Sequence, residues 1–181
     1  MRREPECVLV TGMPGAGKST VTRLVGERFE RAARLGGDDV NGMIVSGFVW
    51  ALGEPRDEAA RQVRLLHRNL CALANNFGDA GFTVLVDAVL PSRADLDFFL
   101  AELRSHHVQL VVLDPGIATC RYRNTVRAPS ERFDFDGYDM LDASMRSQYG
   151  DVGWWFDTSA LTPGQTADRI VHEGRRRARV R

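Results

Sequence analysis

The sequence Gly12-Met-Pro-Gly-Ala-Gly-Lys-Ser19 follows a short apolar run, Cys7–Thr11, and overlaps the start of a segment with helical spacing, Gly17–Phe29. It fits the pattern G-x-x-x-x-G-K-[ST], and a position between a strand and a helix is the context in which this pattern forms a phosphate-binding P-loop. Glycines let backbone N–H groups turn toward one anion, and the start of the helix adds partial positive charge. We therefore predict that ATP phosphates bind to Gly12, Met13, Pro14, Gly15, Ala16, Gly17, Lys18, Ser19 and Thr20.

Lys18 is the only lysine among 24 basic residues; all the others are arginines. An ammonium at this place in a P-loop reaches the β- and γ-phosphates, and the hydroxyl of the following serine, Ser19, ligates Mg²⁺. The alternative is a glycine-rich turn that carries an exposed lysine. The position between strand and helix favours the phosphate-binding interpretation.

The composition is that of one globular domain. The chain has 181 residues, of which 44% are hydrophobic and 27% charged, and its formal net charge is zero. Its apolar runs fall far short of the roughly 18 residues that a membrane span needs, and the first residues lack the apolar core of a signal peptide. We expect a single domain over residues 1–181 in the cytoplasm, with no membrane contact. Three distant cysteines, Cys7, Cys71 and Cys120, predict reduced thiols, and no histidine has zinc-ligand spacing with them.

Strands and helices alternate along the chain. Apolar runs predict strands at 7–11, 32–36, 83–88, 108–113 and 154–157, and helical spacing predicts helices at 17–29, 57–79, from Ser92, at 117–127 and from Thr162. Ser92 with Asp95, and Thr162 with Gln165, have the spacing of capping boxes. This alternation predicts an α/β fold with a five-stranded parallel sheet and helices on both faces, the three-layer arrangement of P-loop nucleotide-binding proteins. Ligands of such folds bind beyond the carboxyl ends of the strands.

The chain lacks the features of two large P-loop classes. GTPases recognise guanine with N-K-x-D, which requires a second lysine, and ring ATPases of the AAA type need a longer chain with an added helical domain. A small phosphoryl-transfer kinase remains. Such an enzyme needs a phosphate cradle, a Mg²⁺ anchor, a base for the acceptor hydroxyl and arginines that close over the transferring group.

Two carboxylate positions follow predicted strands. Asp87 follows the apolar strand residues Thr83–Val86 and is placed beside the P-loop to support Mg²⁺ with Ser19 or to contact the acceptor. Its alternative is a capping or turn aspartate. Asp38 and Asp39 follow the strand at 32–36, where a carboxylate faces the γ-phosphate and accepts the acceptor's proton. Their alternative is an N-cap pair for a helix near Asn41–Ser46, and a division in which Asp38 acts while Asp39 caps is also open.

Arginines gather in a predicted lid at about 121–137, which contains Arg121, Arg123, Arg127 and Arg132 around Ala128-Pro129-Ser130. Guanidinium groups there would neutralise the transferring phosphoryl group, with Arg127 catalytic and Arg132 near the acceptor. The alternative is a solvated loop. Arg61, Arg64 and Arg68 are interpreted as a solvated helix face. The five arginines of residues 175–181 are interpreted as a solvated, fraying helix end, with a nucleic-acid or phosphate contact as the alternative.

The segment that follows Asp38 and Asp39, which we expect to bind the acceptor, contains apolar residues and no basic ones. No basic residue lies between Arg34 and Arg56, so a phosphorylated acceptor would lack a counter-charge. Met43, Phe48 and Trp50 instead suggest an apolar, partly aromatic pocket for an uncharged hydroxyl compound. The alternative is that these three side chains belong to the core.

These motifs resemble the small P-loop kinases grouped with chloramphenicol phosphotransferase and, more distantly, zeta-toxin, shikimate and gluconate kinases. The matching segments are 12–20, 35–38, 84–87, 123–127 and 155–158. The resemblance implies a fold like that of nucleoside monophosphate kinases, with Asp38 as the acceptor's base and Asp87 supporting the acceptor site. It further implies that Arg123 and Arg127 contact ATP and that the loop from Thr158 and Ser159 to Leu161 packs on adenine. Segments 40–52 and 133–138 depart from the family pattern, so the acceptor's identity stays open.

Three functions are compatible with these residues. The first is an ATP- and Mg²⁺-dependent kinase that phosphorylates a hydroxyl of a small molecule, such as an antibiotic or a related metabolite. The second is a kinase of nucleic-acid ends or of a nucleotide sugar, which only the basic segment 175–181 supports. The third is a nucleotide-binding module without catalysis.

Overall fold

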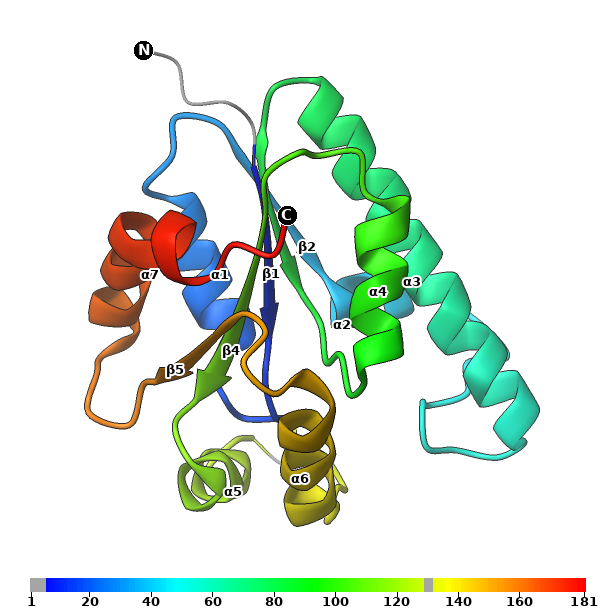
Figure 1. The fold of residues 1–181 in the computed structure, drawn as a ribbon. Coiled ribbons are helices and arrows are strands. Elements are labelled where there is room, and N and C mark those ends of the chain that lie inside the picture. The colour runs from blue at the N-terminus through cyan, green and yellow to red at the C-terminus, as the bar shows by residue number, and fades with distance from the viewer. Residues whose placement is uncertain (1–5, 129–131) are drawn as a thin grey trace.

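The computed structural model describes residues 6–128 and 132–181. Its five strands form one sheet in the order β2-β3-β1-β4-β5, and every neighbouring pair is parallel. The strands are β1 (Cys7–Thr11), β2 (Ala32–Gly36), β3 (Thr83–Asp87), β4 (Val108–Asp114) and β5 (Trp154–Asp157). The predicted five-stranded parallel sheet is confirmed. In Figure 1 the carboxyl ends of its strands point downward.

Helices cover both faces of the sheet, which is why the strands are apolar along their whole length. Successive strand residues point to opposite faces: Val8 and Val10 enter one apolar cluster, whereas Cys7 and Leu9 enter the other. The first face is covered by α1 (Lys18–Gly26) and α7 (Pro163–Arg177), and the second by α3 (Arg56–Asp79) and α4 (Arg93–Glu102). Near the carboxyl ends of the strands lie α2 (Gly37–Asn41), α5 (Ile117–Thr125) and α6 (Tyr138–Tyr149) (Figure 1).

Both predicted capping boxes are present. In α4, the Ser92 hydroxyl accepts a hydrogen bond from the Asp95 N–H, and the Asp95 carboxylate accepts one from the Ser92 N–H at 3.0 Å. Thr162 and Gln165 exchange the same pair of bonds at the start of α7. Side chains therefore satisfy backbone donors that the first helical turns leave open.

Two helices differ from the sequence-based expectation. Helix α6 was not predicted, although Tyr138, Leu141, Met145 and Tyr149 lie on one face and contact the core. The second difference is α2, which begins at Gly37 rather than near Asn41–Ser46. Asp38 and Asp39 therefore lie inside its first turn, where negative charge stabilises a helix.

The C-terminal segment is docked, so the prediction that this helix end frays is wrong, although four of its five arginines are solvent-exposed as predicted. Its backbone pairs with the start of β4: the Leu110 N–H donates to the Ala178 carbonyl at 2.7 Å, and the Val180 N–H donates to Val108 at 2.9 Å. The Arg181 guanidinium donates to the carbonyls of Leu103, Ser105 and Leu100. Arg175 lies 2.8 Å from the buried carboxylate of Glu6. The segment therefore occupies the edge of β4 before Val111, where the pairing of β4 with β5 begins.

The three cysteines are buried free thiols, as predicted. Burial raises the pKa of Cys7 and Cys71 to about 12 and that of Cys120 to about 11, so all three stay protonated at neutral pH. Across residues 6–128 and 132–181, no helix combines the length and the apolar character that crossing a bilayer requires.

Replacing Arg181 by alanine removes a guanidinium that binds three backbone carbonyls. Hydrogen bonds from charged donors each contribute about 1.5–3 kcal/mol. Because one half-buried side chain makes all three bonds, which are not additive, we expect the free energy of unfolding to fall by about 2 kcal/mol, near the value for a single bond. Urea unfolding followed by circular dichroism measures this change. Arg176→Ala, at an exposed position in the same segment, is the control and should cost less than about 0.5 kcal/mol. Equal losses in the two variants would contradict the docked segment.

Candidate active site

The P-loop connects β1 to α1, and all three of its glycines have positive φ angles, that of Gly17 being 97°. At two of them a side chain would also collide with the backbone. Gly12 has a φ of 139° and Gly15 a φ of 83°. A Cβ atom at Gly12 would lie 2.6 Å from the backbone oxygen of Leu113, and one at Gly15 would lie 2.6 Å from that of Cys120. The loop is therefore pressed against the end of β4 and against α5. A larger residue at either position would push it out of place.

Lys18 lies across this loop. Its Nζ atom donates hydrogen bonds to the carbonyls of Gly12 at 2.9 Å and Met13 at 3.1 Å. Burial lowers the pKa of the Lys18 ammonium, and the carboxylates of Asp87 and Asp38 oppose that shift. Both aspartates that the sequence analysis assigned to the chemistry are thus close enough to act on the single lysine.

Asp87 is the buried carboxylate at the centre of the site. It ends β3, is 4% exposed, and accepts hydrogen bonds from the hydroxyls of Thr22 at 3.1 Å and Ser19 at 3.3 Å. Burial raises the pKa of Asp87, whereas the Arg34 guanidinium, the hydroxyls and Lys18 act in the opposite direction. The alternative interpretation of Asp87 as a capping or turn aspartate does not fit these contacts, because the partners of Asp87 lie on α1 and β2.

The oxygen atoms of Ser19 and Asp87 fit Mg²⁺ better than a zinc-type metal. Mg²⁺ prefers oxygen ligands and usually takes only one or two from the protein, with water and phosphate oxygens completing its shell. A hydroxyl and a carboxylate 3.3 Å apart, directly after a phosphate-binding loop, match that preference. No cluster of three or more histidine, cysteine, aspartate or glutamate residues with metal-site geometry occurs in the described part of the chain.

Asp38 and Asp39 have different surroundings although they are adjacent in α2. Asp39 accepts hydrogen bonds from the Arg34 guanidinium at 2.6 and 2.9 Å. Asp38 is exposed and acts on Lys18 across the site. The two residues therefore differ in their contacts, as in the division that the sequence left open, in which Asp38 acts and Asp39 has another partner.

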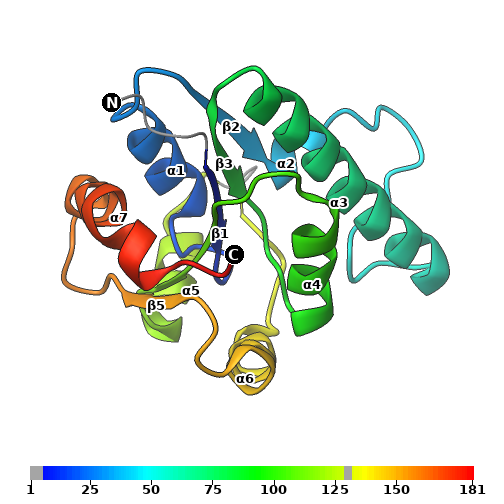
Figure 2. The same cartoon turned by 45° about the horizontal axis from the view of Figure 1, so that its top comes forward.

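Met43, Phe48 and Trp50 are exposed, so their alternative interpretation as core residues is wrong. They are 68%, 46% and 45% exposed and belong to the loop between α2 and α3. This loop stands away from the sheet in both ribbon views (Figures 1 and 2). Trp50 packs edge-on against Phe135, with 6.5 Å between ring centroids. The loop therefore touches the segment that follows α5, and the three residues border an open surface.

The arginines of the predicted lid divide into two groups. Arg123 donates to the P-loop carbonyls of Gly15 and Ala16 at 3.4 and 3.3 Å, and Arg127 stacks on Phe133 and lowers the pKa of Lys18. Arg132 donates to the Arg127 carbonyl at 3.0 Å, whereas Arg121 pairs with Asp139 on α6. Arg123 and Arg127 are therefore the lid arginines next to the phosphate-binding loop. Pro129 and Ser130, also assigned to the lid, lie outside the described residues.

Thr158 and Ser159 lie in the loop after β5, at the same edge of the sheet as the P-loop. Thr158 is buried, and its N–H donates to the Asp114 carbonyl at 3.3 Å. Ser159 is exposed, and its N–H donates to the Asp157 carboxylate at 2.9 Å. Of this pair, Ser159 has the side chain open to a ligand.

Two site residues were not singled out from the sequence. Thr22 lies one helical turn after Lys18 and three residues after Ser19, so its hydroxyl points to the same side of α1 and reaches Asp87. Arg34 lies on β2, two residues before Gly36, and therefore shares a strand face with the residue beside Asp87. Helical spacing gave a signal for Thr22. Arg34 required knowledge of which strands are neighbours.

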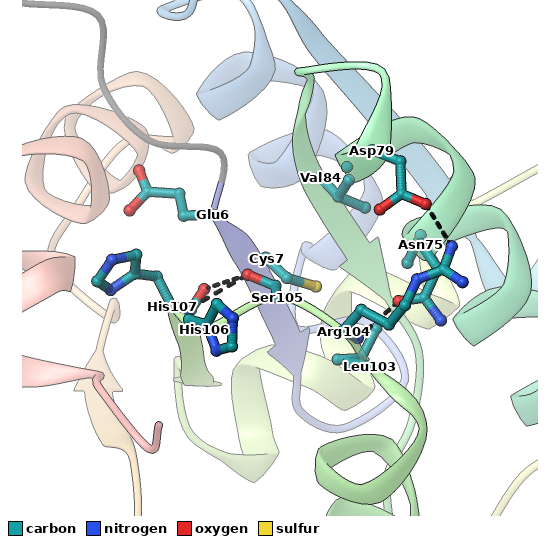
Figure 3. Close-up of a pocket in the computed structure, with 12 residues that line it drawn as sticks. Glu6, Cys7, Asn75, Asp79, Val84, Leu103, Arg104, Ser105, His106 and His107 are labelled. Carbon is teal, nitrogen blue, oxygen red and sulfur yellow. Dashed lines mark hydrogen bonds and ion pairs between the residues drawn. The ribbon is translucent and has the colours of Figure 1, made fainter.

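A cavity of about 270 Å³ lies at the other end of the sheet (Figure 3). It is lined by residues at the amino ends of β1, β3 and β4, among them Cys7, Val84 and His106. Arg104 lies 2.5 Å from Asp79, and its N–H donates to Asn75. This cavity is separated from the P-loop by the length of the strands and takes no part in the site.

The strand order, the P-loop on the central strand and the carboxylate at the end of β3 define a P-loop kinase domain. The chain belongs to the AAA_33 family, described as an AAA domain, whose model matches residues 7–148. The name is shared with the ring ATPases that the sequence analysis set aside, whereas structures similar over nearly the whole chain include small kinases.

Three solved structures show how widely the fold is shared. A Janibacter sugar kinase is 18% identical, with 93% of each chain covered and a TM-score of 0.66. The Mycobacterium tuberculosis APS kinase, solved with AMPPNP and APS, is 19% identical over 93% of this chain and 96% of its own, with a TM-score of 0.63. The Deinococcus radiodurans tunicamycin resistance protein is 15% identical over 93% and 95%, with a TM-score of 0.66. A comparison with curated proteins gives no match.

Gly15→Ala should disrupt nucleotide binding. The added methyl group meets the Cys120 carbonyl, so we expect the affinity for Mg-ADP, measured by calorimetry, to fall at least about tenfold, equivalent to about 1.4 kcal/mol. Gly116→Ala is a matched control because Gly116 has nearly the same φ, 84°, but open space around its missing Cβ. That variant should lose stability and keep its affinity. Unchanged affinity in Gly15→Ala would contradict the proposed phosphate cradle.

Proposed function

We propose that this protein transfers the γ-phosphoryl group of ATP to a hydroxyl group of a small, uncharged molecule. The observation that carries the proposal is the convergence of an ammonium, a hydroxyl–carboxylate pair and a second, exposed carboxylate on one end of the sheet, formed by Lys18, Ser19, Asp87 and Asp38. These are the parts that phosphoryl transfer between a nucleotide and an alcohol needs. Membership of a P-loop kinase family supports the same conclusion.

In the proposed reaction, Asp38 accepts the proton of the acceptor hydroxyl while that oxygen forms a bond to the γ-phosphorus. The bond from the γ-phosphorus to the bridging oxygen breaks, and ADP leaves with that oxygen. Lys18 and Arg127 offset the negative charge spread over the phosphoryl oxygens. Mg²⁺, when bound, would neutralise charge on the β- and γ-phosphates, and Ser19 and Asp87 are the residues that would hold it.

The segment 121–137 is proposed as a lid. Arg123 already contacts a carbonyl of the P-loop. Arg127 stacks on Phe133, and its charge acts on Lys18. Closing over ATP would exclude water, which otherwise competes with the acceptor hydroxyl. Thr158 and Ser159 are proposed to lie against the adenine.

The acceptor side supports an uncharged compound. Residues 35–55 contain no basic residue, and the nearest arginine, Arg34, is already engaged by Asp39 and Asp87. A phosphate or carboxylate on the acceptor would therefore gain no counter-charge from this segment. Met43, Phe48, Trp50 and Arg132 are proposed to border the acceptor, with the exposed rings covering its apolar parts. Sugars and hydroxyl-bearing antibiotics are the classes that the kinase and resistance-protein neighbours suggest.

The structure-based evidence favours this function over the two alternatives. The arginines at 175, 177 and 181 pair with Glu6, Glu173 and backbone carbonyls, which removes most of the support for a nucleic-acid substrate. A protein that only binds nucleotide does not require a carboxylate such as Asp38, whose charge acts on Lys18. Incubating the protein with ATP, Mg²⁺ and a panel of sugars and hydroxylated antibiotics tests the proposal by mass spectrometry. Gain of one phosphoryl group by a compound is the expected result, and ATP binding without transfer to any compound would contradict it.

Lys18→Ala should abolish most transfer. Removing one preorganised group that stabilises transition-state charge typically costs about 10²–10³ in kcat, and we expect a loss of at least that size, measured as product formed per unit time. Lys18→Arg should also be defective, because a planar guanidinium does not reproduce the compact ammonium. Near-normal turnover in the alanine variant would refute the assignment.

Asp38→Asn and Asp39→Asn separate the two adjacent carboxylates. A general base typically contributes about 10²–10⁴ in rate, so Asp38→Asn should lower kcat by about that factor. Asp39→Asn should change kcat only a few-fold, since its carboxylate is engaged by Arg34. Both variants have the same change in charge and lie in the same turn of α2. The opposite order of effects would assign the base to Asp39.

A further inference from the structure

Arg34 crosses the face of β2 toward the site. In the parallel pairing of β2 with β3, Gly36 lies beside Asp87, and Arg34, two residues earlier, points to the same face of the sheet. Because Gly36 has no side chain, the surface between Arg34 and the end of the strand is open. The guanidinium lies in that space.

Two carboxylates meet this guanidinium. Its Nη1 and Nη2 atoms donate to one oxygen of Asp39 at 2.6 and 2.9 Å, and its Nε atom lies 3.5 Å from an oxygen of Asp87. The Arg34 side chain is 27% exposed and that of Asp39 is 65% exposed, so water reaches this ion pair from the side of the carboxylate. One arginine therefore joins the first turn of α2 to the end of β3.

Gly36 is part of this arrangement. A Cβ atom at that position would lie 2.3 Å from the Asp39 carboxylate and 2.8 Å from the Arg34 guanidinium. Its φ of −85° is one that any residue adopts, so the backbone does not require glycine there. The absence of a side chain at residue 36 is needed for the ion pair and not for the turn.

The contact between Arg34 and Asp39 determines which carboxylate of α2 is available to the acceptor. Two adjacent carboxylates in one helical turn would both be drawn to Lys18, and both would repel the phosphates. Of the two adjacent carboxylates of α2, Arg34 binds Asp39, and Asp38 is the one whose charge acts on the pKa of Lys18. Helix α2 has five residues and no side-chain N-cap. The buried side chain of Val40 packs in the core, and the Arg34–Asp39 ion pair ties the polar side of the same turn to β2.

We propose that Arg34 is a positioning residue that holds Asp39 against the end of β2 and thereby leaves Asp38 as the acceptor's base. This inference rests on the function proposed above, because it concerns which carboxylate the acceptor meets. It adds a residue and a role that the P-loop motif does not contain. It also explains why two aspartates follow β2 although the chemistry needs one.

The central test is a double-mutant cycle of Arg34→Gln and Asp39→Asn. The readouts are phosphorylation of the acceptor found in the screen and release of inorganic phosphate from Mg-ATP, in which water replaces the acceptor. Arg34→Gln should lower kcat at least about tenfold because it frees Asp39, while Asp39→Asn stays within a few-fold of wild type. The double variant should recover most of the lost kcat, since the carboxylate that needed holding is gone.

Hydrogen exchange gives a readout that does not depend on turnover. The Gly42 amide, which donates to the Asp38 carbonyl of the first turn of α2 at 2.9 Å, should exchange at least about tenfold faster in Arg34→Gln than in wild type, because the tie to β2 is lost. Gly36→Ala should act in the same direction and more weakly, since the methyl group displaces the flexible ends of two side chains without removing a charge. The control is Arg28→Gln, an arginine of similar exposure that pairs at 3.0 Å with Asp168 away from the site.

Each result decides between defined outcomes. The proposal is overturned if Arg34→Gln has wild-type kcat and wild-type exchange in α2, or if the double variant is as slow as Arg34→Gln, which would mean that Arg34 acts through Asp87. It is also overturned if Asp39→Asn alone is as slow as Asp38→Asn. A wrong proposed function would give a different result. Asp38→Asn would then release inorganic phosphate from Mg-ATP as fast as wild type. The hydrogen-exchange measurement would still show whether Arg34 holds α2.

Discussion

The site depends on the groups that stabilise one buried carboxylate, that of Asp87 at the end of β3. Asp87 is almost fully covered, and an ionised carboxylate in such a place is costly unless charged or hydrogen-bonding groups surround it. The compensating groups come from separate elements: hydroxyls of α1, the guanidinium of β2 and the ammonium of the P-loop. Because these groups must converge on Asp87, the position of each element is restricted. The same restriction places the P-loop next to the end of β2 and the first turn of α2, the two sides that we propose for ATP and for the acceptor.

The sequence predicted the elements whose chemistry is local. Apolar runs such as Cys7–Thr11 are typical of strands covered on both faces, and the spacing of Ser92 with Asp95 indicates where α4 begins. The P-loop is likewise a local motif, because its glycines and its lysine act within eight consecutive residues. Lys18, Ser19, Asp38 and Asp87 could all be placed at one edge of the sheet once parallel pairing was inferred.

Features that depend on distant contacts could not be predicted. Arg34 looks like an ordinary polar strand residue until β3 is known to be its neighbour. The C-terminal arginines look solvated because their partners, Glu6 and the carbonyls near residue 103, lie elsewhere in the chain. Helix α6 was missed for a different reason, since its apolar stripe is interrupted by aspartate, serine and arginine residues that dominate the local composition.

The central position of β1 has a consequence for how the chain reaches this fold. Val8 pairs with Leu85 on one side and with Gln109 on the other, so the first strand to leave a ribosome waits for partners many residues away. Parallel pairing across such separations closes large loops and is slow. Until β3 and β4 emerge, an apolar strand with two open edges is exposed to other chains. Chaperones that shield nascent apolar segments would therefore matter most in the interval before β4 is synthesised.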